Sequence, residues 1–381
     1  MTNASYSKGL EGVIAGESVI CLIDGQKGKL YYRGYTIEDL VEKSSYEEIV
    51  YLLLFEHLPT AVELDEFTKN FRSGRHIVLP IQEMIRNFPP SGDLMELLQS
   101  VMSYLSGYVA HKIKHSATCN CRSTLHQVAQ LATVIAAYQR FKEGKSSIAP
   151  REDLSHGANF LYMLRGEEPQ PYEASIMDKC LILHAEHGFN ASTFTARVVA
   201  SSLSTCYSSI SAAIGSLRGS LHGGANEQVM EMIREIGEVD NVDTWLDKTL
   251  AEKKKIMGMG HREYRVKDPR SSIMEEFLRE LSGKKNNSGN LSLLTKLEKS
   301  FRLRMDEKGK PLYPNVDYFS GSVYALLGIP QQLFSPIFAM SRCAGWLAHI
   351  LEQRKDNRLF RPECLYTGPS PRAYEPIERR E

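Results

Sequence analysis

The sequence predicts a mainly α-helical protein with two domains and one small β-hairpin near its N-terminus. Apolar residues recur at helical spacing through most of the chain, for example in residues 153–166. Residues 18–34 instead contain two short β-prone runs around a turn rich in glycine and aspartate, which is typical of a hairpin. The length of 381 residues exceeds what one ordinary core accommodates, so we expect two domains.

Capping residues and apolar stripes indicate where single helices begin and end. Ser45 and Glu48 form a capping-box pattern at the start of a helix that continues through an apolar run. After Pro269, apolar side chains recur at i, i+1, i+4, i+5 and i+8, and we expect Gly283 to end this helix. The polar stretch 282–290 is then predicted to be an exposed loop.

Two apolar segments have alternative interpretations. Residues 333–351 are long enough to span a membrane, but they contain Pro336 and Arg342. An arginine at the centre of a bilayer costs about 2.5–3.5 kcal/mol, so we interpret the segment as a buried helix of a soluble protein. Residues 191–220 combine small polar residues with an apolar stripe, which indicates closely packed helices. These lie either inside a domain or, as we favour, at a subunit interface.

Charge and cysteine content argue against several classes of protein. Basic and acidic residues both number 46, so the net charge is zero and nucleic acid is a poor candidate partner. Seven scattered cysteines argue against a disulfide framework and favour a reducing compartment. We interpret Cys119 and Cys121 as ordinary thiols. The first residues lack the basic-then-apolar pattern of a signal peptide, and we expect a cytoplasmic protein.

His184 and His187 lie three residues apart and would share one face of a helix that ends just after His187. A metal site would also need Glu186, which points elsewhere on such a helix, and no further ligand follows at a recognisable spacing. We therefore predict no metal site. His187 either contacts a ligand or merely caps the helix end.

His222 and His261 each follow or precede glycines, which permit close approach of the backbone to a ligand. His222 could instead occupy a plain surface turn. Many basic residues surround His261, which suits either an anion site or a solvated basic surface. Asp268 and Pro269 suit a helix start and would place Arg270 in the first turn, where backbone N–H groups attract anions. The basic residues are Lys253, Lys254, Lys255, Arg262, Arg265, Lys267 and Arg270.

Two further charged residues lie among apolar ones. Asp317 has apolar and aromatic neighbours that would raise the pKa of its carboxyl group, which suits a general base, although it could instead cap the helix that follows. Arg342 belongs to the predicted buried helix and needs an anionic or hydrogen-bonding partner. From the residues alone we favour a distant carboxylate over a bound anion.

Several separated segments together resemble the citrate synthase family. They occur in the order and approximate spacing of that family, and the N-terminal GLEGV, IDGQKGKLYYRGY and LPT look like its short bacterial form. The resemblance covers nearly the whole chain. The segments are LILHAEHGFNAS (181–192), SLHGGAN (220–226), GHREYRVKDPR (260–270), PNVDYFSG (314–321), MSRCAG (340–345) and RLFRPECLYTGP (358–369).

The resemblance implies a condensation of acetyl-CoA with oxaloacetate, followed by hydrolysis of citryl-CoA. Asp317 would remove a proton from the methyl group, and His222 would donate a hydrogen bond to the enolate oxygen. His261 would hydrogen-bond and protonate the ketone of oxaloacetate. No metal and no cofactor beyond the acetyl-CoA co-substrate is implied. Oxaloacetate would be bound by His187, Arg270, Arg342 and Arg361.

The family also implies a homodimer in which Arg361 reaches the active site of the partner subunit. A large domain of residues 1–223 and 329–381 would form the dimer interface, and a small domain of residues 224–328 would close over the site. One of the lysines at 253–255 would meet a CoA phosphate. The other residues implied for CoA are Ile256, Met257, Gly258, Met259, Gly260 and Arg265.

Two alternative functions stay open. A 2-methylcitrate synthase would use propionyl-CoA, and one methylene is worth only about 1–3 kcal/mol of discrimination. An inactive helical assembly protein would keep the scaffold without chemistry, but Asp317, His222 and His261 are all present. Ser220 replaces a proline that is common in the family, which affects loop geometry rather than a reacting group. The sequence begins without the N-terminal extension of the longer family type, so we expect no NADH control.

Overall fold

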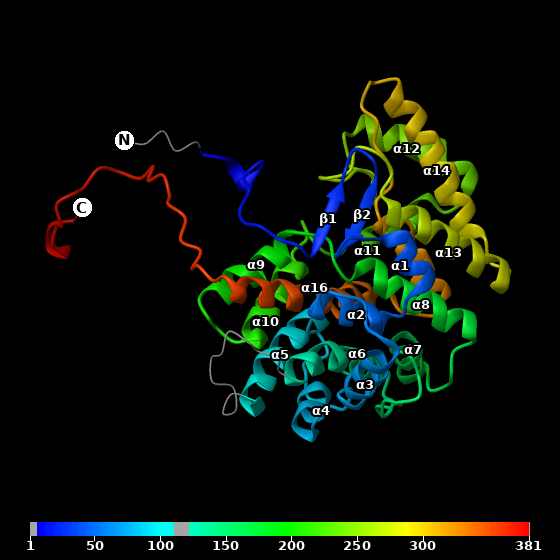
Figure 1. The fold of residues 1–381 in the computed structure, drawn as a ribbon. Coiled ribbons are helices and arrows are strands. Elements are labelled where there is room, and N and C mark those ends of the chain that lie inside the picture. The colour runs from blue at the N-terminus through cyan, green and yellow to red at the C-terminus, as the bar shows by residue number, and fades with distance from the viewer. Residues whose placement is uncertain (1–5, 110–121, 381) are drawn as a thin grey trace.

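The computed structural model describes residues 6–109 and 122–380, and this part of the chain is mainly helical, as predicted (Figure 1). Cys119 and Cys121 lie outside the described residues. The helices are α1 (Ile37–Lys43), α2 (Tyr46–Phe55), α3 (Ala61–Ser73), α4 (Leu79–Arg86), α5 (Leu94–Val109), α6 (Arg122–Lys142), α7 (His156–Arg165), α8 (Pro171–His184), α9 (Ala191–Ser201), α10 (Cys206–Arg218), α11 (Ala225–Ile236), α12 (Val242–Ala251), α13 (Pro269–Lys285), α14 (Gly289–Asp306), α15 (Asp317–Leu326) and α16 (Phe334–Lys355).

Helix α16 runs through the middle of the molecule and packs against α2, α6, α8, α9 and α10. Its side chains are almost all buried, and these include Arg342 and His349. The buried helix predicted for residues 333–351 is thereby confirmed. No helix in the described part of the chain combines the length and apolar character that a bilayer crossing needs.

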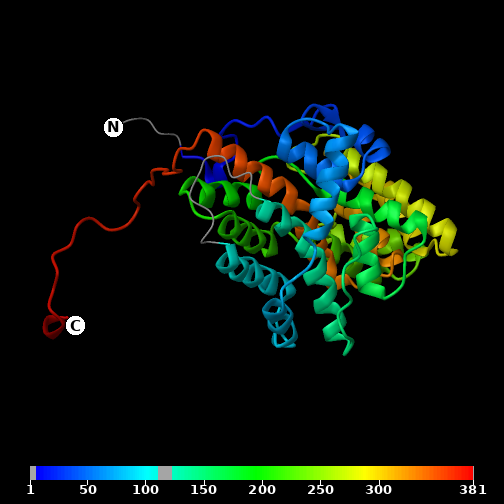
Figure 2. The same ribbon diagram turned by 60° about the horizontal axis from the view of Figure 1, so that its bottom comes forward.

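The helices from α11 to α15 pack mainly on one another. Helix α13 packs on α15 and α14, α15 packs on α11, and α12 packs on α14. Figures 1 and 2 show α12, α13 and α14 gathered at one end of the molecule, away from α3, α4 and α5. The chain enters this group after α10 and returns through α15 to the central helix α16.

The N-terminal hairpin is confirmed by the antiparallel strands β1 (Cys21–Asp24) and β2 (Lys29–Tyr32). A short third strand, β3 (Tyr35–Thr36), extends the sheet beyond what the sequence predicted. The hairpin turn contacts the loop before α13, because the Arg265 N–H donates to the Gly25 carbonyl at 2.9 Å. The hairpin therefore helps to position the loop that begins with His261.

Two helix ends, those of α8 and α13, differ from the predictions. Helix α8 ends at His184, three residues before His187, and the chain reaches a positive φ of 60° at Gly188. Helix α13 continues past Gly283 to Lys285 and is ended by Asn286 in the left-handed conformation, so the predicted loop 282–290 shrinks to a short exposed turn. The patterns of capping residues, apolar stripes and hairpin turns thus predicted that these elements exist, but they predicted the residues at which the helices end less accurately.

The capping and start signals are confirmed in part. Ser45 accepts the Glu48 backbone N–H at 3.2 Å and begins α2, as predicted. Asp268 caps α13, and Pro269 is its first residue. The alternative interpretation of Asp317 as the cap of the following helix does not hold, since Val316 occupies the N-cap position. Asp317 is itself the first residue of α15, and its N–H is bonded by the Asn315 side chain at 3.0 Å.

Replacing Gly25 with alanine should destabilise the protein. A Cβ at Gly25 would lie 2.1 Å from the Glu263 carbonyl oxygen, so the hairpin and the loop must separate. We expect Gly25→Ala to lower the free energy of unfolding by about 1–3 kcal/mol, as for other overpacked sites. Urea denaturation measures it, with Gly107→Ala as the control because no atom lies within 4 Å of a Cβ there. An unchanged midpoint for Gly25→Ala would contradict the contact.

Candidate active site

A glycine loop and the start of α15 are joined by backbone contacts. The Gly260 N–H donates to the Tyr313 carbonyl at 2.8 Å, and the Asn315 N–H donates to the Gly258 carbonyl at 2.9 Å. Gly258 has a φ of 74°, and a Cβ there would lie 2.8 Å from the Tyr318 Cα. Only glycine fits this close approach, as its sequence neighbourhood indicated. The loop thereby carries His261 toward the helix that begins with Asp317.

The protonated nitrogen of His261 is defined by its backbone contacts. Its Nδ1 accepts the N–H groups of Glu263 at 3.0 Å and Tyr264 at 3.3 Å. In the neutral ring the proton therefore lies on Nε2. Burial, reinforced by the positive charge of Arg270, lowers the pKa of His261 to about 4. His261 is thus a neutral hydrogen-bond donor at neutral pH.

His222 lies in the turn between α10 and α11, and the opposite nitrogen carries its proton. Its Nε2 accepts the Ser192 N–H at 3.2 Å and lies 2.8 Å from the Ser192 Oγ. Nδ1 is then the protonated nitrogen of the neutral ring. Burial and the charge of Arg342 lower the pKa of His222 to about 4. Sequence reasoning did not single out Ser192, although it ends the segment that carries His187.

His187 is buried and faces Tyr264, another residue that sequence reasoning missed. The His187 Nε2 lies 3.2 Å from the Tyr264 hydroxyl, and the centroids of the His187 and His261 rings are 5.1 Å apart. Burial lowers the pKa of His187 well below its ordinary value, and Arg270 adds to the effect. Tyr264 lies three residues after His261 in the same basic segment, so its position in the motif was the available signal.

Arg270 lies in the first turn of α13, as predicted, but it is already paired. Its Nε and Nη2 donate to the two carboxylate oxygens of Asp268 at 3.1 and 2.7 Å. Asp268 also accepts the Arg270 backbone N–H at 3.0 Å. Both side chains are buried. The sequence located Asp268 as a helix start but not as the partner that fixes the guanidinium plane.

Arg342 differs, because it forms no ion pair with any described residue. Its Nε donates to the His184 carbonyl at 2.7 Å, and its guanidinium lies 4.7 Å from the centroid of the Phe338 ring. The prediction of a distant carboxylate partner is therefore wrong for the part of the chain that the structure describes. Burial lowers the pKa of Arg342, and the charge of Glu186 opposes this shift. The positive charge of Arg342 is thus buried, and the contacts that stabilise it among the described residues are a carbonyl and an aromatic ring.

Asp317 is held at the N-terminus of α15, near these cations. Burial raises the pKa of its carboxyl group to about 6, while the charges of Arg270 and Arg342 oppose the rise. Asp317 is therefore ionised at neutral pH but is more basic than an ordinary aspartate. Arg361, by contrast, is exposed in the C-terminal segment that leaves the body of the molecule (Figure 1). The chain does not bring its own Arg361 to the other residues.

The remaining predicted residues divide into two sets. His184 does not join His187, since its Nδ1 donates to the Cys180 carbonyl at 2.9 Å and its ring packs on Phe338. Within residues 6–109 and 122–380, no three potential ligands gather around a metal position. The other set is the segment implied for CoA, where Ile256 is buried and Arg265 is exposed.

The basic cluster around His261 is partly neutralised by ion pairs. Lys267 pairs with Glu275 at 2.8 Å and with Glu298 at 3.2 Å, and Lys254 pairs with Glu252 at 2.7 Å. Lys253, Lys255, Arg262 and Arg265 are exposed. A cavity of about 430 Å³ opens between α11 and α12 beside this loop, and its lining includes Lys254, Lys255 and Met257.

A family model described as the citrate synthase C-terminal domain matches residues 9–363. The chain belongs to the citrate synthase family. It is 42% identical to a citrate synthase of Synechocystis sp., over 99% of this chain and 95% of that protein. It is 38% identical to a 2-methylcitrate synthase of Shewanella oneidensis, over 98% and 97% of the two chains.

A solved structure of the citrate synthase family has the same fold. It is a citrate synthase of Thermoplasma acidophilum, solved as a ternary complex with carboxymethyl coenzyme A and oxaloacetate. The two folds agree with a TM-score of 0.92 at 34% identity, over 99% of this chain and all of that one. Membership of this family establishes the chain as an enzyme of the acyltransferase type.

His222 and His261 should stay neutral well below the pH at which histidine usually ionises. A free imidazole has a pKa near 6.5, whereas burial lowers both values to about 4. We expect the ring ¹⁵N shifts of both residues to remain those of a neutral imidazole from pH 8 to about pH 5. The shifts of Nδ1 and Nε2 should show opposite tautomers in the two rings. Spectra of His222→Gln and His261→Gln assign the signals, and titration of either near pH 6.5 would contradict the burial.

Proposed function

We propose that this chain is a citrate synthase that acts through Asp317, His222 and His261. It would condense acetyl-CoA with oxaloacetate and water to give citrate and CoA. One observation carries the proposal: two neutral imidazoles with opposite tautomers and a basic carboxylate lie around two buried guanidinium groups. A basic carboxylate can remove a proton from a weakly acidic carbon, and neutral imidazoles can donate hydrogen bonds to oxygens on which negative charge develops. The guanidinium groups can bind a dianion beside them.

Asp317 is assigned the first step, removal of a proton from the methyl group of acetyl-CoA. Its raised pKa of about 6 makes it a stronger base than an ordinary aspartate, and it is still ionised at neutral pH. The thioester is a weak carbon acid, so the enolate oxygen needs stabilisation as its charge develops. The Nδ1–H of His222 is the donor for that oxygen, since its Nε2 is occupied by Ser192.

His261 is assigned the second step. Its Nε2–H would donate to the ketone oxygen of oxaloacetate and transfer the proton as the new carbon–carbon bond forms. Because Nδ1 is held by two backbone N–H groups, the ring is oriented before substrate binds. Water then hydrolyses the thioester of citryl-CoA and releases CoA.

Oxaloacetate has two carboxylates, which suit planar guanidinium groups. Arg342 supports this assignment, because a buried cation without an ionic partner in the described residues gains most from a bound anion. Arg270 would present its fixed plane to the second carboxylate. The proposed set is His187, Arg270, Arg342 and, from the second subunit of a homodimer, Arg361.

The proposal extends to the domains and to CoA. Residues 1–223 and 329–381 would form the large domain and the dimer interface, and residues 224–328 would form a small domain that closes over the substrates. Packing of α11 to α15 on one another supports this division. The loop at 256–260 and Arg265 would contact CoA. The scattered cysteines are in keeping with a cytoplasmic location, and the enzyme would need no cofactor.

A 2-methylcitrate synthase activity is the alternative, favoured by the likeness to the Shewanella oneidensis enzyme. The two functions differ by one methylene of the acyl group. Release of the CoA thiol, followed with oxaloacetate and either acetyl-CoA or propionyl-CoA, gives kcat/KM for each. A higher value for acetyl-CoA supports the proposal, and a higher value for propionyl-CoA overturns it. No release with either would favour an inactive scaffold protein.

Loss of the Asp317 carboxylate should abolish most turnover. We expect Asp317→Asn to lower kcat by about 10²–10⁴-fold, the usual contribution of a general base. In the wild type, kcat/KM for the acyl-CoA should fall about tenfold per pH unit below pH 6, because only the ionised carboxylate removes a proton. Thiol release across pH 5–8 measures both effects. A flat profile down to pH 5 would exclude Asp317 as the base.

Two inactive variants should restore activity when they share a dimer. In a mixed dimer of Arg361→Ala and Asp317→Ala, one site has Asp317 from one chain and Arg361 from the other. The second site lacks both. Random mixing should therefore recover about one quarter of wild-type activity, since about half of the dimers are mixed and each has one intact site. Co-expression with two different tags isolates the mixed dimer, and no recovery would show that Arg361 does not act across subunits.

A further inference from the structure

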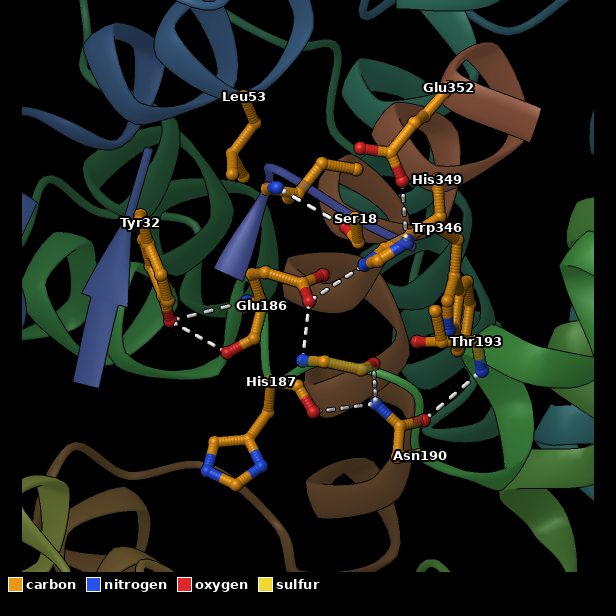
Figure 3. Close-up of polar contacts among 12 residues, drawn as sticks. Ser18, Tyr32, Leu53, Glu186, His187, Asn190, Thr193, Trp346, His349 and Glu352 are labelled. Carbon is orange, nitrogen blue, oxygen red and sulfur yellow. Dashed lines mark hydrogen bonds and ion pairs between the residues drawn. The ribbon is translucent and has the colours of Figure 1, made fainter. Parts of the chain in front are cut away.

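A cluster of four buried or half-buried charged and imidazole side chains adjoins the backbone of His187, and Figure 3 shows three of them, Glu186, His349 and Glu352. We call it the Glu186 cluster, and its members are Glu186, His349, Arg197 and Glu352. Glu186 and His349 are completely buried. The turn after α8, helix α9 and helix α16 contribute these residues. None of them has a place in the steps assigned above, although a buried ionised cluster is costly unless it is paired.

Hydrogen bonds run through the cluster in a single direction. Arg197 donates from Nη1 to Glu352 at 2.6 Å and to the His349 Nδ1 at 3.2 Å. Because Nδ1 accepts, the neutral His349 carries its proton on Nε2 and donates it to the Glu186 Oε1 at 2.9 Å. The same oxygen accepts the Gly188 backbone N–H at 2.5 Å. Helices α9 and α16 are thereby tied to the backbone just after His187.

The backbone just before His187 is tied as well. The Tyr32 hydroxyl of strand β2 donates to the Glu186 carbonyl at 2.9 Å, and it accepts the Glu186 N–H at 3.2 Å. Residues 186 and 188 are thus both fixed. The His187 imidazole points away from the cluster in Figure 3, on the side where Tyr264 and His261 meet it.

Gly345 of helix α16 leaves room for this arrangement because it has no side chain. A Cβ at Gly345 would lie 2.3 Å from the Glu186 Oε2 and 2.3 Å from the Ala185 carbonyl oxygen. The turn therefore rests directly on the helix backbone. Glu186 Oε2 is buried and makes no hydrogen bond to any described residue, so only Oε1 holds the turn.

We propose that Glu186 is a positioning residue that sets the place of the His187 imidazole in the oxaloacetate site. The carboxylate acts through its two bonds at Oε1, to Gly188 and to His349, and not through contact with substrate. The inference rests on the proposed function in one respect, that oxaloacetate is the ligand of His187. Loss of the Glu186 carboxylate should affect oxaloacetate alone. A displaced His187 imidazole would weaken binding of oxaloacetate, whereas the loop at 256–260, proposed to contact CoA, would stay in place.

Three substitutions test the mechanism. Glu186→Ala removes both bonds and should raise KM for oxaloacetate about tenfold or more, since shifting a positioned group by 1 Å costs up to about 10²-fold. Gly345→Ala should have the same effect without altering a polar group. Glu186→Gln keeps an oxygen that accepts both hydrogen bonds, so its KM for oxaloacetate should stay within about threefold of wild type. KM for acetyl-CoA, measured at saturating oxaloacetate, should change by less than about twofold in all three.

Matched controls separate positioning from general damage. Glu47 of helix α2 is also buried and pairs with Arg72 and Arg75, so Glu47→Gln should lower the thermal midpoint and leave KM for oxaloacetate unchanged. Gly283→Ala places a methyl group where no atom lies within 4 Å and controls for Gly345→Ala.

Calorimetric titration with oxaloacetate alone provides a readout that does not depend on turnover. A weaker Kd for Glu186→Ala and Gly345→Ala supports the proposal even if the wild type prefers another acyl-CoA. Failure of the wild type to bind oxaloacetate would refute the proposed function instead. Unchanged oxaloacetate binding in Glu186→Ala, an equal rise of both KM values, or equal losses in Glu186→Gln and Glu186→Ala would each overturn the positioning role.

Discussion

The burial of two guanidinium groups, Arg270 and Arg342, is the constraint on which the site depends. Their charge helps to keep the neighbouring imidazoles neutral and opposes the rise in the pKa of Asp317 that burial causes. The two cations are compensated differently. Arg270 has a full carboxylate partner in Asp268, whereas Arg342 has a carbonyl and an aromatic ring. Arg342 is therefore a buried cation without an ion pair among the described residues, and a bound anion would compensate its charge.

Close backbone contacts hold the candidate site residues in place around these cations. Gly258 lets the loop before His261 touch the start of α15, and Gly345 lets the turn at His187 rest on α16. Gly223 plays the same part beside His222, since a Cβ there would lie 2.2 Å from the Leu217 carbonyl oxygen. Each histidine is thus attached to a helix through a glycine that cannot be replaced without moving the ring. Rigid placement of this kind lowers the reorganisation needed during a reaction.

The same construction explains how one chain joins distant segments. Tyr32 of the N-terminal hairpin holds the backbone at Glu186, and Gly25 of the same hairpin meets the loop after His261. The small sheet therefore helps to position two segments of the candidate site, because it contacts the turn that carries His187 and the loop that carries His261. Helix α16 supplies Arg342, His349 and Trp346 from a single buried surface. The Trp346 indole N–H reaches Ser192 at 3.2 Å and so supports the residue that orients His222.

The sequence by itself determined the helical class, the hairpin, the buried helix around Arg342 and the identity of His222, His261 and Asp317 as candidates. Those conclusions follow from periodicity, glycine placement and order along the chain, which are local properties. Only the tertiary structure decided that Asp268 holds Arg270, that Tyr264 meets His187, and that His222 and His261 carry their protons on opposite nitrogens. Tautomers, pKa values and ion-pair partners depend on atoms that are close in space but distant in sequence. No pattern of residue types along the chain specifies those distances.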